Sequence, residues 1–149
     1  MKKRLPWWAI VLIVGIVLFG LIQLVPYGHN HTNPKVINSP IWDSPATADL
    51  VKRGCYDCHS NETTWPWYSN VAPASWLVQR DVEEGRRSLN FSEWPTSTLG
   101  QQGLMDAAVR IIQEGEMPPI QFTLIHPEAR FTSAELDQIT KGMLNSVPK

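Results

Sequence analysis

A long segment without charge near the N-terminus is the feature that most constrains how this chain can fold. Leu5–Val25 comprises 21 consecutive uncharged residues, most of them apolar. As a helix with a rise of about 1.5 Å per residue, this segment would be roughly 31 Å long, which is enough to cross the hydrocarbon core of a bilayer. Lys2-Lys3-Arg4 precede it, and positively charged flanks stay on the cytoplasmic side. We therefore expect residues 1–27 to form a signal anchor with one transmembrane helix.

Aromatic residues at the two ends of this segment support the same prediction. Trp7 and Trp8 stand at one end and Tyr27 at the other, where membrane proteins place interfacial aromatic side chains. The alternative is a cleaved signal peptide, which has an apolar region of about 7–15 residues and a cleavage site of small residues. Val25-Pro26-Tyr27-Gly28 offers no such site. In either case the rest of the chain is expected outside the cytoplasm, and an uncleaved anchor would hold it at the membrane on the periplasmic side.

Residues 28–45 have the composition of a linker. They are rich in Asn, Pro, Ser and Gly and show no hydrophobic period, so an extended or irregular chain is expected. His29 and His31 form a His-x-His pair that could hold a metal ion loosely. A solvated linker is the favoured interpretation.

The remaining residues, 46–149, are expected to form a small helical domain. Caps and hydrophobic periodicity predict four helices, over about 45–53, 73–85, 99–114 and the segment after the capping box Thr132-Ser133-Ala134-Glu135. Gly54, Gly85 and Gly115 are expected to end the first three. No segment alternates with a period of two, so the domain is predicted to be all-α. Four modest helices make a thin core, and a bound prosthetic group would supply part of the missing apolar mass.

The string Cys55-Tyr56-Asp57-Cys58-His59 is a C-x-x-C-H motif, the attachment signature of c-type haem. Two thiols three positions apart on a helical turn can form thioethers with the two vinyl groups of one porphyrin. The adjacent His59 then becomes the proximal iron ligand, with its other ring nitrogen donating to a backbone carbonyl. A thioredoxin-like pair would need a βαβ context, and a structural zinc site would need a second ligand pair. One covalent haem c is therefore the favoured prediction.

Two residues compete for the distal side of the iron. Met117 is followed by Pro118 and Pro119, which bar it from helical geometry and stiffen the loop. A thioether held in this way suits a sixth ligand and favours ferrous iron. The alternative role for Met117 is core packing. His126, which precedes Pro127, is the rival ligand and would give a lower potential.

The motif Cys55–His59, combined with the Met-Pro-Pro loop and the capped final helix, resembles class I c-type cytochromes. More closely, the chain resembles the bacterial haem-binding-domain family, small anchored or exported proteins with one C-x-x-C-H motif. The strings that carry the resemblance are CYDCHSNETTWPWYSNVAP (55–73), SWLVQRDVEEGRRSLNFSEW (75–94), GEMPP (115–119) and IHPEARFT (125–132). With the connecting helix they cover about residues 46–147. The resemblance implies haem binding, a redox role, and a small cytochrome c-like helical domain after the transmembrane helix.

Aromatic residues concentrate after the haem motif. We expect five of them to wall the haem and exclude water: Trp65, Trp67, Tyr68, Trp76 and Trp94. Arg80, Arg86 and Arg87 could pair with the propionates. The alternative is that these aromatic residues form an ordinary core and that the arginines face solvent.

Charge and domain content narrow the function. Residues 5–149 carry 10 basic and 14 acidic groups, so no basic field exists for a nucleic-acid partner. The favoured function is a membrane-tethered carrier of single electrons between redox protein partners, with no catalytic residues of its own. The alternative is a haem-based enzyme of the peroxidase kind, or a gas or redox sensor, with an open distal position. Apart from His126, the folded domain offers no distal histidine for such chemistry.

Overall fold

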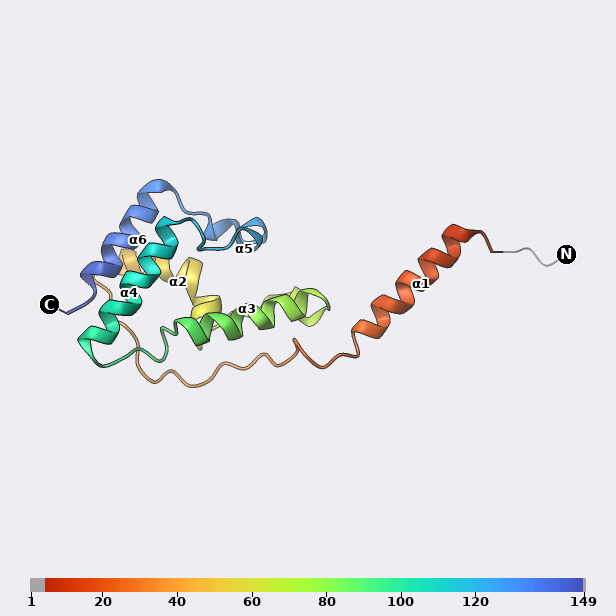
Figure 1. The fold of residues 1–149 in the computed structure, drawn as a ribbon, viewed down its shortest axis with the longest axis horizontal. Coiled ribbons are helices and arrows are strands. Elements are labelled where there is room, and N and C mark those ends of the chain that lie inside the picture. The colour runs from red at the N-terminus through yellow and green to blue at the C-terminus, as the bar shows by residue number, and fades with distance from the viewer. Residues whose placement is uncertain (1–4, 149) are drawn as a thin grey trace. The chain divides into compact units, whose positions relative to one another are not determined.

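A computed structural model describes residues 5–148, and every element within that range is helical apart from an isolated bridge between Asn38 and Glu93 (Figure 1). The prediction of an all-α protein is confirmed. In chain order the elements are α1 (Trp7–Ile22), α2 (Pro45–His59), the 3-10 turn η1 (Trp67–Asn70), α3 (Ala74–Ser88), α4 (Thr98–Gln113), α5 (Ile120–Ile125), the 3-10 turn η2 (Pro127–Ala129) and α6 (Ser133–Asn145). The chain divides into two compact units, one of residues 5–31 with Trp65–Asp81, and one of Thr32–Thr64 with the chain from Val82 onwards.

The N-terminal helix is shorter than the sequence predicts. α1 has 16 residues, which at about 1.5 Å per residue gives roughly 24 Å, less than the thickness of a bilayer core. It begins after Pro6, and Gln23 ends it before Pro26 is reached. Within residues 5–148 no helix is long and apolar enough to cross a membrane. The predicted transmembrane helix is therefore wrong.

Three further predictions rested on that helix and are corrected with it. They are the signal anchor, the membrane as a partner through a single span, and the membrane-anchored location with the haem domain on the periplasmic side. Lys2-Lys3-Arg4, which suggested the orientation of the span, lie outside the described residues.

Side-chain hydrogen bonds to backbone hold the first unit together. The amide of Gln23 donates to the carbonyl of Ala72 at 3.1 Å and accepts from the Ala72 N–H at 2.9 Å. The ring of His31 stacks on Trp65 with centroids 4.5 Å apart, and its Nε2 donates to the carbonyl of Ser69 at 2.9 Å. The predicted His-x-His pair therefore has one histidine engaged with protein. Among the described residues no group of three metal-binding side chains forms.

The second unit is built on α2, α4 and α6, and α6 packs against both of the other helices (Figure 1). Their apolar faces meet in one core whose most deeply buried members are Val51, Phe91, Met105, Ile139 and Met143. Burial of side chains of this size stabilises the fold by about 1.5–3 kcal/mol each. The helical stripes predicted over 99–114 and after the capping box supply much of this core.

Helix ends match the sequence at three places. The Ser44 side chain accepts from the Thr47 N–H at the start of α2. Gly115, with φ +76°, follows α4 in a conformation that favours glycine. The capping box at Thr132 and Glu135 begins α6. These predictions are confirmed. Each depends on the chemistry of residues within a single helical turn.

Gly54 and Gly85 do not end helices, so both predicted helix stops are wrong. α2 continues through Gly54 to His59, and α3 continues through Gly85 to Ser88. Each glycine instead permits a close approach. A Cβ at Gly54 would overlap the Phe131 ring, and one at Gly85 would overlap the backbone carbonyl of Cys58.

Most of the predicted linker belongs to the second unit and is hydrogen-bonded within it. The N–H of Ile37 donates to the carbonyl of Ser92 at 2.8 Å, and the N–H of Trp94 donates to the carbonyl of Asn38 at 3.0 Å. Trp42 packs edge-on against Phe91. The segment is extended, as expected, but tertiary hydrogen bonds order it.

Candidate functional site

The second unit contains an apolar cavity of about 220 Å³. Cys55 and His59 of α2 border it, together with Met117 of the loop between α4 and α5. Apolar side chains from α4, α6 and the loops make up most of the remaining wall: Leu89, Phe91, Leu104, Ile111, Ile112, Phe131, Leu136, Ile139 and Met143. The structure thus brings the thioether of Met117 to the same cavity as the thiol and the imidazole of the C-x-x-C-H motif, from which it is distant in the sequence.

His59 is the last residue of α2. Two backbone carbonyls fix its ring, one from Gly85 of α3 and one from Leu89, the residue that follows α3. Nδ1 lies 3.0 Å from the carbonyl oxygen of Gly85 and 3.1 Å from that of Leu89. Carbonyl oxygens only accept, so Nδ1 carries the proton and the lone pair is on Nε2. Burial lowers the pKa of His59, against the opposing effect of these two hydrogen bonds. The ring is a neutral imidazole suited to metal ligation, and the predicted hydrogen bond to a backbone carbonyl is present.

Cys55 borders the cavity one helical turn before His59. Burial, with a smaller contribution from the neighbouring Cys58, raises the pKa of the Cys55 thiol to about 12. At neutral pH this thiol stays protonated, whereas redox-active C-x-x-C pairs depend on a thiolate stabilised by a low pKa. The environment of Cys55 therefore argues against a thioredoxin-like dithiol. The two cysteines are not joined to each other.

Cys58 is not among the residues that border the cavity. It is half-buried, and its backbone carbonyl lies against Gly85 of α3. The same close approach brings the Gly85 carbonyl within reach of the His59 ring. Gly85 of α3 thus has two roles beside the end of α2. Its lack of a side chain admits the Cys58 carbonyl, and its own carbonyl oxygen accepts a hydrogen bond from the His59 ring.

Met117 is 38% exposed and lies at the rim of the cavity, next to Pro118, which also borders it. Met143 borders the same cavity but is 1% exposed and belongs to the core. Met105 is a core residue that does not border the cavity. Of these three methionines, only Met117 is on a loop and accessible.

His126 occupies a different environment. Its Nδ1 lies 2.8 Å from a carboxylate oxygen of Glu128, and its ring stacks on Phe122 with centroids 4.2 Å apart. It does not border the cavity. The cavity therefore contains one of the two predicted distal ligands.

None of the five predicted pocket aromatics borders the cavity. Trp65, Trp67, Tyr68 and Trp76 belong to the first unit. Trp94 is buried in the core of the second unit, stacked on Phe91, which does border the cavity. Arg86, considered above for the propionates, has its guanidinium bonded to protein groups instead.

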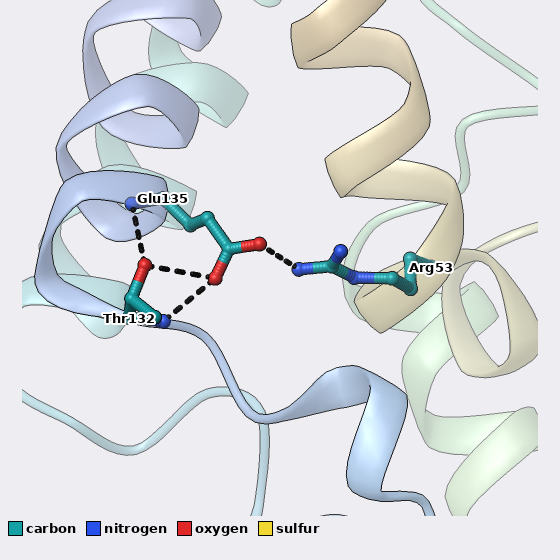
Figure 2. Close-up of polar contacts among 3 residues, drawn as sticks. All are labelled: Arg53, Thr132 and Glu135. Carbon is teal, nitrogen blue, oxygen red and sulfur yellow. Dashed lines mark hydrogen bonds and ion pairs between the residues drawn. The ribbon is translucent and has the colours of Figure 1, made fainter.

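Phe131 is a wall residue that the sequence analysis missed. Its ring lies against Gly54, beside Cys55, and the guanidinium of Arg53 lies 5.0 Å from its centroid. Arg53 is in turn paired with Glu135, the carboxylate of the α6 capping box (Figure 2). A glycine directly before a C-x-x-C-H motif is the one sequence signal that could have indicated a ring packed there.

The capping box holds Glu135 firmly. Thr132 N–H donates to its carboxylate at 2.8 Å, and the Glu135 N–H donates to the Thr132 hydroxyl at 3.3 Å (Figure 2). The hydrogen bond from Arg53, followed by those from Thr132, lowers the pKa of Glu135 to about 2. This arrangement joins the first turn of α6 to α2 next to the cavity.

Comparison with protein families matches residues 17–145 to the haem-binding domain. The chain belongs to the haem-binding domain family. Haem is therefore the group that this family member binds, and the predicted resemblance to the family is confirmed. The relation to class I c-type cytochromes stays a prediction. Neither the comparison with curated proteins nor that with solved structures gives a match.

Proposed function

We propose that this haem-binding protein holds one haem c through thioethers to Cys55 and Cys58 and carries single electrons. His59 is the proximal iron ligand in this proposal, and Met117 is the distal one. The observation that carries it is the common cavity, which Cys55, His59 and Met117 all border. His126 is the alternative distal ligand.

Cys55, His59 and the wall of the cavity fit the group. The wall of the cavity is apolar, as a porphyrin requires, and His59 already has the tautomer that leaves Nε2 available. When bound, haem supplies a reversible one-electron couple at its iron. The chain's residues hold and orient it: the Gly85 and Leu89 carbonyls fix the His59 ring, and the apolar wall excludes water.

An electron carrier fits the cavity better than a haem enzyme does. A peroxidase-like reaction needs an acid and a base beside an open iron position. Apart from Cys55, His59 and Met117, the polar side chains at the cavity are Ser88 and Arg110. Arg110 is exposed, and its Nη1 lies 3.7 Å from a carboxylate oxygen of Glu114, the residue that follows α4. Redox protein partners are part of this proposal, identified only as donors and acceptors of one electron.

An optical spectrum of the purified protein tests the proposed function. Six-coordinate iron with a thioether ligand shows a charge-transfer band at long wavelength, and it binds carbon monoxide slowly because Met117 must first dissociate. We expect this band and this slow binding. A high-spin spectrum with rapid binding of carbon monoxide would overturn the carrier and favour the enzyme or sensor.

A further inference from the structure

The C-terminal end of α2, which carries the haem motif, is held by donors that come from outside the helix. The last carbonyls of a helix have no partner within it and must find one elsewhere. The chain leaves α2 directly at Ser60, which is extended, and no glycine cap follows. The donors are the Ser60 hydroxyl to Tyr56 O, the Thr63 hydroxyl to Asp57 O, the Phe91 N–H to His59 O, and the Arg86 guanidinium to Ser60 O.

Arg86 is the only charged donor in this set, and its guanidinium makes four hydrogen bonds. Nε donates to the Ser60 carbonyl at 2.7 Å and Nη1 to the Thr32 carbonyl at 3.0 Å. Nη2 donates to Asn33 Oδ1 at 3.0 Å and to Thr63 Oγ1 at 2.9 Å. The planar fork of arginine suits such a fixed set of acceptors better than the flexible ammonium group of lysine does. The Arg86 side chain thus joins α3, on which it lies, to the end of α2 and to the extended segment that contains Thr32 and Asn33.

The position of Arg86 on α3 connects it to the imidazole of His59. It follows Gly85, whose carbonyl accepts from His59 Nδ1. A single turn of α3 therefore fixes both the ring of the proximal ligand and the backbone of the residue after it. A cation also suits a helix C-terminus, where the macrodipole is negative.

The charge on Arg86 is partly removed from water. Burial lowers its pKa, and the nearby Cys58 and Glu93 oppose that shift. A guanidinium remains protonated in proteins in spite of such shifts. The structure therefore holds a permanent positive charge at the carbonyl of Ser60, the residue after His59, and the Glu93 carboxylate partly balances that charge.

We propose that Arg86 positions the haem-attachment turn and raises the reduction potential of the bound haem. This inference rests on the proposed function. Reduction takes one electron from an external one-electron donor and converts ferric to ferrous iron, which lowers the positive charge of the site by one. A fixed cation beside the proximal ligand disfavours the more positive ferric state. Glu93 opposes this effect, because its carboxylate favours the ferric state.

Redox titration of four variants of the full chain, loaded with haem, tests this inference. Arg86→Gln should lower the potential, whereas Arg87→Gln, which removes the same charge from an exposed neighbour, should change it much less. Arg86→Lys keeps the charge and should stay closer to the wild type in potential. Its haem-free form should nevertheless melt at a lower temperature, because the fork of hydrogen bonds is lost.

Glu93→Gln should shift the reduction potential in the opposite direction. This measurement is informative even if Arg86→Gln folds poorly. It removes a negative charge while keeping an oxygen that can accept from Asn61, so the potential should rise. A purely structural role for Arg86 would not give shifts of opposite sign. The inference is overturned if Arg86→Gln and Arg87→Gln have the same potential, or if Glu93→Gln lowers it. Failure of the proposed function is distinct, since the wild type would then carry no covalent haem or would show a high-spin spectrum.

Discussion

Met117 is the residue on which the sixth coordination position depends in the proposed site. Its replacement by Ala leaves the rim of the cavity without a sulfur atom and should open the iron position. We expect the charge-transfer band to disappear, carbon monoxide to bind much faster, and the reduction potential to fall, since a thioether favours ferrous iron. Optical spectra and redox titration of the haem-loaded variant measure all three.

Two matched variants control this experiment. Met105→Leu changes a methionine that is 1% exposed and away from the cavity, and should leave the spectrum intact. His126→Ala removes the rival ligand, whose Nδ1 contacts Glu128, and should also leave the band in place. If His126→Ala removes the band and Met117→Ala does not, the axial pair is His59 and His126.

Gly85 is a second residue whose substitution has a specific expected effect, here on the free energy of unfolding. A methyl group there would overlap the Cys58 carbonyl oxygen and lie 2.9 Å from its carbonyl carbon. Both atoms belong to backbone and cannot turn away, so Gly85→Ala should cost about 1–3 kcal/mol of unfolding free energy. Gly103→Ala is the control, because a Cβ at that position in α4 meets nothing within 4 Å. That change should stabilise the chain by about 0.5–1 kcal/mol, as measured by urea unfolding. Equal effects of the two substitutions would contradict the close packing of α2 and α3.

At the scale of elements, the start of α6 is expected to depend on pH. The pKa of Glu135 is about 2 in the folded chain against an ordinary value of 4.5, chiefly because Arg53 donates to the carboxylate. A depressed pKa means that the ionised group stabilises the fold above pH 4.5, and that this contribution is lost as the pH falls towards 2. We expect the melting temperature of the haem-free chain to decline over that window. Glu135→Gln should flatten this decline, whereas Asp137→Asn, on the same helix, should not. A decline of the same steepness in Glu135→Gln would assign the acid sensitivity to another group.

Helix boundaries show what sequence reasoning could and could not reach at the scale of elements. The cap at Ser44 and the box at Thr132 were predictable because their chemistry is local. Gly54 and Gly85 were misread, since a glycine that ends a helix and a glycine that admits a neighbour look alike in one sequence. Only the tertiary contacts with Phe131 and Cys58 distinguish the two cases.

At the scale of the whole molecule too, features that depend on local sequence could be predicted, whereas features that depend on tertiary contacts could not. The all-α fold agrees with the periodicity. Cys55, His59 and Met117, which the motifs single out, border one cavity, and their roles toward haem stay a prediction. The length of α1 did not follow from counting uncharged residues, because Pro6 and Gln23 bound a shorter helix. The walls of the cavity did not follow either. They come from α4, α6 and Phe131, and the tryptophans expected to wall the haem are not among the residues that border the cavity.

The cavity also makes a prediction about the stability of the whole chain. Core residues Ile112, Ile139 and Met143 border it, so a group that fills it adds apolar contact to the core itself. Each Å² of apolar surface removed from water contributes about 25 cal/mol. Haem-loaded protein should therefore melt at a higher temperature and more sharply than the haem-free chain, as followed by circular dichroism. Identical melting curves would contradict the placement of haem in this cavity.

The most direct test of the central claim is whether haem stays on the polypeptide when the fold is lost. The haem-loaded chain is denatured, extracted with acidified acetone, and separated by denaturing electrophoresis with staining for haem. Thioethers to Cys55 and Cys58 predict a stained band at the mass of the chain and an extract without colour. The double variant Cys55→Ala, Cys58→Ala, which keeps His59, is predicted to lose the band. Haem that extracts freely from the unmodified protein would contradict covalent attachment.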